Sequence, residues 1–116
     1  MERHDLWTLS EAEVTKLGIP VSSKGYFYLI VAAVISFKIG MRKAALSKEI
    51  YARIAEMNDV TRISVERDIR NSIIKAWEDS SGALRYMYPE YAKNPTNSEV
   101  IAFITSRIRL ETARRI

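Results

Sequence analysis

The feature that most constrains the fold is an uncharged apolar run over residues 25–37, GYFYLIVAAVISF. Its thirteen residues fall well short of the roughly 20 that a helix needs to span a bilayer, so the run predicts a buried core element. Its β-branched residues also suit a buried strand. The run is long and unbroken, and no partner strand is evident, which favours a helix over residues 24–39. Ser22 or Ser23 is the expected N-cap, and Gly40 is expected to end the helix.

The rest of the chain alternates helical periodicity with turn signals, which predicts an all-α fold of about six helices in one domain spanning residues 1–116. A Ser or Thr before an apolar periodic stretch marks a helix start, and a Glu three residues later strengthens it. The other expected starts are Ser10 (with Glu13), Ser47, Thr61, Ala83 and Thr96 (with Glu99). The corresponding ends are Leu17 to Pro20, Asn58 with Asp59, Glu78, Tyr91 and Glu111.

Two consecutive elements over about residues 48–78 match a helix-turn-helix, in which a short helix and a tight turn precede a longer helix. Ala55 is small where the helices would cross, Thr61 is placed to cap the second helix, and Val65 lies four residues further on. A plain helical hairpin is the alternative. The second helix, over residues 61–77, also carries apolar residues at spacings of four and three, which predict a core stripe. These are Val65, Ile69, Ile73 and Ala76.

The other side of the 61–77 helix carries Arg, Asn and Ser, which can bond to base edges and phosphates. The candidate base-reading residues are Ser64, Glu66, Arg67, Arg70 and Asn71. The candidate phosphate contacts are Thr61, Arg62 and Lys75 near the helix ends, and Lys93 further along the chain. The alternative is a solvated face on which Glu66 and Arg70 form a salt bridge across one turn, worth about 0.2–0.5 kcal/mol.

Composition points to an anionic partner and away from catalysis. A formal net charge of +4 and a pI near 9.5 favour an anionic partner, and the predicted helix-turn-helix makes double-stranded DNA the expected one. The chain has no cysteine, one histidine (His4) and no Gly-rich phosphate loop, so we expect no enzyme activity, cofactor, metal site or small-molecule substrate. The N-terminus has no apolar signal segment, and no membrane association is expected. A cytoplasmic, nucleoid-associated protein is the expectation.

Several motifs together resemble one family, the C-terminal DNA-binding effector domain of the stage zero sporulation protein A response regulator. The similarity runs almost end to end, and without a gap between Gly25 and Trp77. The motifs are Leu17-Gly18-Ile19-Pro20, Lys24-Gly25-Tyr26 with Tyr28-Leu29, Lys48 to Ala55 (KEIYARIA), Val65-Glu66-Arg67 with Ile69-Arg70 and Ala76-Trp77, and Pro95-Thr96-Asn97-Ser98-Glu99 with Arg109-Leu110-Glu111.

The resemblance implies a six-helix domain whose 61–77 helix reads a TGNCGAA-like box, with Glu66 and Arg67 among the base-reading positions. The chain departs from the family at Ser64, where a basic residue is usual, and at Asn58, where an aromatic residue is usual. The segment before Pro95 also looks several residues shorter. The phosphorylatable receiver domain of the family has no counterpart in the 116 residues.

Two functions therefore remain open. The first is a stand-alone, sequence-specific transcriptional regulator that gains affinity by abundance, by self-association or tandem binding on DNA, or from a partner. The second is an interaction protein that has lost specific readout and modulates a full-length regulator or another partner. The departure at Ser64 and the shortened segment motivate the second.

Overall fold

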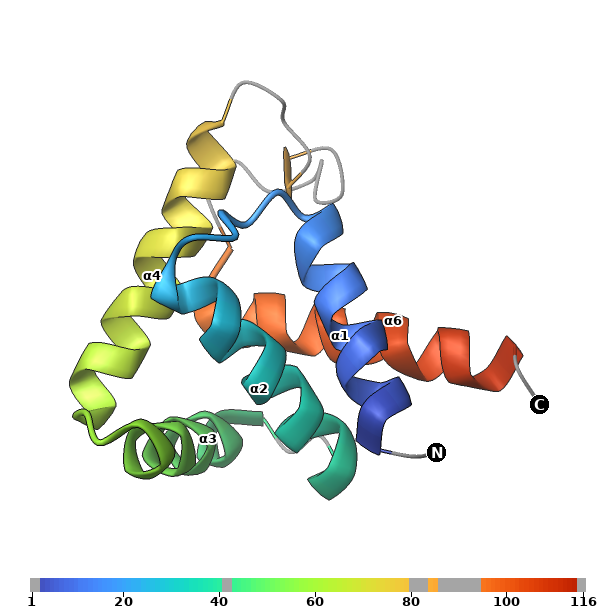
Figure 1. Cartoon of the computed structure of the whole chain (residues 1–116), viewed down its shortest axis with the longest axis horizontal. Coiled ribbons are helices and arrows are strands. Elements are labelled where there is room, and N and C mark those ends of the chain that lie inside the picture. The colour runs from blue at the N-terminus through green and yellow to red at the C-terminus, as the bar shows by residue number, and fades with distance from the viewer. Residues whose placement is uncertain (1–2, 41–42, 80–83, 86–94, 115–116) are drawn as a thin grey trace.

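The computed structural model describes all residues except 1–2, 41–42, 80–83, 86–94 and 115–116. The described residues form helices and no strand, which confirms the all-α prediction. The helices are α1 (Arg3–Lys16), α2 (Lys24–Ile39), α3 (Lys43–Asn58), α4 (Arg62–Glu78) and α6 (Asn97–Arg114) (Figure 1). Of the further helix expected over residues 83–91, only Leu84 and Arg85 fall within the described residues. No helix in the described ranges is long and apolar enough to cross a bilayer.

Helix α2 lies at the centre and packs against α1, α3, α4 and α6 (Figure 1). The Ser23 hydroxyl caps it by accepting a hydrogen bond from the Tyr26 N–H at 3.2 Å. At the other end, Gly40 takes a φ of 79° and donates its N–H to the Ser36 carbonyl at 3.0 Å. Positive φ carries no steric cost for glycine. Both ends predicted for this helix are therefore confirmed.

The predicted start of α1 at Ser10 is wrong, because the helix already begins at Arg3. Ser10 is fully buried, and its hydroxyl donates to the Leu6 carbonyl one turn earlier at 2.9 Å. Glu13, its expected capping partner, instead reaches Arg107 of α6 at 3.4 Å. Ser10 and Glu13 therefore have the spacing of a capping box, but Ser10 bonds within α1 and Glu13 pairs with α6.

The predicted start of α3 at Ser47 is also wrong, because α3 begins at Lys43. Residues 43–46 (KAAL) are strong helix formers, so the helix extends back past the serine.

The start of α6 is predicted correctly, with a reciprocal capping box. The Thr96 N–H donates to Glu99 Oε1 at 2.8 Å, and the Glu99 N–H donates to Thr96 Oγ1 at 3.2 Å.

Candidate nucleic-acid interface

Helices α3 and α4 meet at a short turn. Asp59 takes a φ of 54°, in the left-handed region that Asn and Asp adopt more readily than most residues. The Val60 N–H donates to the Ala55 carbonyl at 3.0 Å and satisfies an acceptor at the end of α3. Thr61 then caps α4, and its hydroxyl accepts from the Ser64 N–H at 3.0 Å. The predicted turn and the predicted cap are both confirmed.

Helix α4 buries one side and exposes the other. The core stripe is at most 2% exposed, as its spacing predicts, and comprises Val65, Ile69, Ile73 and Ala76. On the opposite side, Ile63, Arg67 and Arg70 recur at spacings of four and three and are all exposed; we call these three residues the outer stripe. Figure 1 shows α4 at the edge of the molecule, next to α3. This edge presents a helix with two arginines on its outward side.

Two ion pairs lie on or beside the outer stripe. Glu66 Oε1 lies 3.1 Å from Arg70 Nη1, and the two side chains are 49% and 50% exposed. Arg67 Nε lies 3.7 Å from Asp68 Oδ1. The salt bridge expected for a solvated face is therefore present. An exposed pair of this kind is worth about 0.2–0.5 kcal/mol, less than the roughly 1–3 kcal/mol of a bidentate contact to a base. The pairs therefore leave both arginines available to a stronger ligand.

The other predicted base-reading residues lie beside the outer stripe. Glu66 borders it on one side and Asn71 on the other, and both are exposed. Ser64 lies further round the helix, is partly buried, and donates its hydroxyl to the Thr61 carbonyl at 2.8 Å. Because this hydroxyl hydrogen is donated within the first turn, Ser64 can only accept further hydrogen bonds, through the lone pairs of its oxygen.

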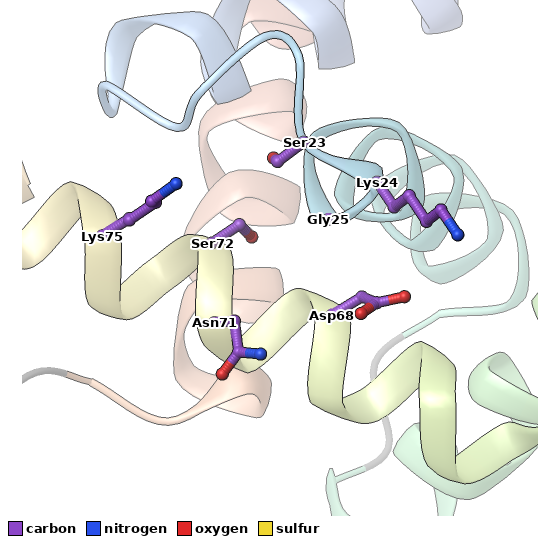
Figure 2. Close-up of a pocket in the computed structure, with 7 residues that line it drawn as sticks. All are labelled: Ser23, Lys24, Gly25, Asp68, Asn71, Ser72 and Lys75. Atoms are coloured by element: carbon purple, nitrogen blue, oxygen red, sulfur yellow. The ribbon is translucent and has the colours of Figure 1, made fainter.

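A shallow hollow separates α4 from the start of α2 (Figure 2). It is lined by Ser23, Lys24, Gly25, Asp68, Asn71, Ser72 and Lys75. Figure 2 shows Lys24 and Lys75 on opposite sides of the hollow, with amino groups that do not converge. The hollow therefore does not gather its charges around one small ligand. Instead, the two lysines provide separate positive charges beside α4. Sequence reasoning selected Lys75 but missed Lys24, since the two lie on different helices.

Helix α2 approaches α4 at Gly25. A Cβ atom at this position would lie 2.6 Å from the Cβ of Ser72, and closer still to the Ser72 hydroxyl and the Asp68 carbonyl oxygen. The Ser72 side chain is itself buried and donates to the Ile69 carbonyl at 2.8 Å. No side chain fits between the two helices, so the glycine determines how closely they cross.

Asn97, the first residue of α6, joins three helices beside the outer stripe. Its Nδ2 donates to the backbone carbonyl of Glu66 in α4 at 3.0 Å, and its side chain also hydrogen-bonds Tyr51 of α3. Burial raises the pKa of the Tyr51 hydroxyl, an effect that the Asn97 hydrogen bond opposes. Sequence reasoning missed Asn97 because its α4 partner lies 31 positions away in the chain.

The predicted phosphate contacts divide between the two ends of α4. Thr61 and Arg62 are exposed where the helix begins, and Lys75 is exposed in its last turn. Lys93 lies outside the described residues. Within the described ranges, no group of three or more His, Asp or Glu side chains is placed to hold a metal ion.

A protein-family model matches most of the chain. The model of the family described as "Sporulation initiation factor Spo0A C terminal" matches residues 11–108, well over half of the chain. The matched range contains the whole of α2, α3 and α4, together with all the predicted site residues.

Proposed function

We propose that the 116 residues form one sequence-specific DNA-binding domain that regulates transcription, because the chain belongs to the Spo0A C-terminal family. This is a family of DNA-binding effector domains. In this proposal α3 and α4 are the two helices of a helix-turn-helix, and α4 reads base edges in the major groove. The site read is a box similar to TGNCGAA. The family supports no catalytic role.

The observation that carries the proposal is the exposure of two arginines on the outer stripe. Arg67 is 55% exposed and Arg70 is 50% exposed, on a helix whose opposite side is buried. A helix with its side chains is about 10–12 Å across, and the major groove is about 12 Å wide. Packing within the fold does not require arginine at either position, whereas guanine presents two acceptors that a guanidinium can contact at once.

Each candidate base-reading residue has a chemical partner. Arg67, at the centre of the outer stripe, donates to guanine, and Arg70 does so once it leaves Glu66. Glu66 accepts from the amino group of cytosine, and Asn71 pairs with adenine on the side that faces α2. Ser64 contributes acceptor lone pairs only, since its hydrogen is already donated to Thr61. This is a weaker contact than the basic residue usual in the family.

Phosphate contacts position the helix in the groove. Thr61 and Arg62 lie at the start of α4, where free backbone N–H groups also favour an anion. Lys75 contacts the backbone near the end of α4, and Lys93 is assigned the same role. Lys24 adds a positive charge from α2, a helix without an acidic residue in its first turn.

A single domain that makes one set of groove contacts gains affinity when a second copy binds an adjacent box, because the second contact is then effectively intramolecular. We therefore expect tandem boxes to bind more tightly than a single box. A full-length regulator of the family is the other candidate for the neighbouring position.

The test is fluorescence anisotropy with a TGNCGAA duplex and a scrambled duplex of equal composition. We expect the box to bind roughly 10³-fold more tightly or better. Arg67→Ala should lower affinity for the box by about 10- to 100-fold, in line with the loss of one bidentate contact. Arg114→Ala is the matched control, since this arginine is 65% exposed and pairs with Glu111 near the end of α6. It should keep the preference for the box.

The alternative is an interaction protein, and the internal bonds of Ser64 and of Glu66 with Arg70 favour it, because part of the reading surface is already satisfied without DNA. Weak, equal and salt-sensitive binding to both duplexes would support this alternative and contradict specific readout. Such a protein should then associate with a full-length regulator in a pull-down with purified components.

A further inference from the structure

Ile63 is the most exposed large apolar side chain in the described part of the chain. It is 73% exposed in the first turn of α4. Isoleucine is only a moderate helix former, because its branched side chain loses freedom on a helix, so local stability does not favour it at an exposed position. Ile63 therefore contributes little to the stability of the fold, and its position suggests a role in binding.

That position is the N-terminal end of the outer stripe. Ile63 lies one turn before Arg67 and two turns before Arg70, on the side of α4 opposite the core stripe. In a helix-turn-helix, the N-terminal residues of the second helix are those that contact base edges. If α4 enters the major groove, Ile63 enters with it, directly after the Thr61 cap.

We propose that Ile63 reads the 5-methyl group of a thymine by packing against it in the major groove. This inference rests on the proposed function and adds an apolar contact to a reading surface that otherwise consists of polar and charged side chains. The thymine methyl is the apolar group that base pairs present in the major groove, and apolar side chains recognise it. Contact with the methyl removes both apolar surfaces from water.

Met57 and Val60 are also exposed, at 65% and 38%, near the end of α3 and in the turn that follows. An apolar surface for a protein partner is therefore the competing explanation of Ile63. DNA is favoured because Ile63 shares its stripe with two arginines, whose guanidinium groups suit base edges and phosphates. A protein partner would not distinguish thymine from uracil.

The experiment replaces each thymine of the box, on either strand, by 2′-deoxyuridine, which removes the methyl and leaves the hydrogen-bonding edge unchanged. One buried methyl corresponds to about a fourfold change in Kd, so we expect wild-type protein to lose about three- to tenfold affinity at one such position. Ile63→Ala should bind the thymine duplex about as weakly as wild type binds the substituted one, and should not discriminate between them. The discrimination should not depend on salt, because no charge is involved.

Leu110→Ala is the matched control, since Leu110 is a 47% exposed apolar residue on α6. It should retain wild-type discrimination between thymine and uracil. Two outcomes would overturn the role of Ile63 and leave the proposed function intact. In the first, wild-type protein prefers the box but loses no affinity at any substituted thymine. In the second, the substitution lowers the affinity of Ile63→Ala and of wild type equally. Equal binding of wild-type protein to box and scrambled duplexes would overturn both. A shift of Ile63→Ala alone in sedimentation velocity, without any change in discrimination, would assign Ile63 to a protein interface instead.

Discussion

The two sides of α4 are subject to different constraints. The core stripe packs against helices that come from elsewhere in the chain, so its size, shape and polarity are determined by those neighbours. The outer stripe is exposed, and the ion pairs of its two arginines are made with residues of α4 itself, so packing against other helices does not determine which residues it carries. Its chemistry is informative for this reason: two arginines and an isoleucine at regular spacing are not what folding alone would select.

Stability and DNA recognition should therefore depend on opposite sides of α4. Substitutions on the core stripe should cost stability and leave the intrinsic preference for a DNA sequence unchanged in whatever fraction remains folded. Substitutions on the outer stripe should cost DNA affinity and leave stability unchanged. Gly25 and Asn97 contact α4 and help to hold it in place. Substitutions at these two residues should therefore lower both stability and DNA affinity.

The largest expected effect is on the core stripe. Ile69→Ala should lower the free energy of unfolding by about 2–5 kcal/mol, because Ile69 is fully buried and its truncation leaves a cavity. Urea denaturation followed by circular dichroism measures this loss. Arg67→Ala, on the outer stripe, should change stability by less than about 0.5 kcal/mol. If the two variants were equally unstable, the separation between the two sides would not hold.

The next effect concerns the crossing of α2 and α4. Gly25→Ala should lower the free energy of unfolding by about 1–3 kcal/mol, because the added methyl meets the Asp68 carbonyl and the Ser72 side chain. This cost outweighs the roughly 1 kcal/mol that alanine usually gains over glycine in a helix. Thermal unfolding tests it, with Lys24→Ala at the neighbouring exposed position as the control. A stabilised Gly25→Ala would mean that the helices can separate without cost.

A smaller effect is expected at the junction of α3, α4 and α6. Asn97→Ala should cost about 0.5–1.5 kcal/mol, the usual contribution of a lost hydrogen bond. Because Asn97 holds the Glu66 carbonyl, this variant should also weaken box binding although it removes no base contact. Asn71→Ala is the opposite case, since this exposed amide should contribute to binding and not to stability. Unfolding curves and anisotropy on both variants distinguish the two roles.

The smallest effect in stability is at the surface ion pair. Glu66→Gln should lower the free energy of unfolding by about 0.2–0.5 kcal/mol, and by less at high salt. Glu49→Gln removes a pair of the same spacing on α3, where Arg53 lies at 3.0 Å, and should cost a similar amount. Only Glu66→Gln should alter which base is preferred at one position of the box. A matching change in Glu49→Gln would point to a general effect of charge.

The separation also explains what could be predicted from the sequence. Periodicity is sufficient for the core stripe, and the central helix follows from one apolar run with Ser23 and Gly40 at its ends. The start of α1 could not be predicted, since Ser10 occurs in a capping pattern but donates within the helix. A local pattern does not reveal which hydrogen bond a buried hydroxyl will make.

The candidate site was predictable only in part, for a related reason. Arg67, Arg70 and Asn71 are apparent from residue type and helical spacing. Asn97 is not, because its contact with α4 depends on tertiary structure. Ile63 is not apparent either, since an isoleucine in a helix is ordinarily assigned to the core, and only its exposure in the structure shows that it is not there.

The attachment of α4 through its buried side chains and its main chain, and not through its outer stripe, has an evolutionary consequence. Asn97 bonds to the backbone carbonyl of residue 66, and the close approach at Gly25 involves the backbone carbonyl of residue 68 and the Ser72 side chain, so the Glu66 side chain takes no part in either. Positions 63, 66, 67 and 70 are therefore free to change identity while the helix keeps its place. A lineage could acquire new target sites by exchanging these side chains, and the same exchanges offer a route to engineered variants with altered specificity on an unchanged scaffold.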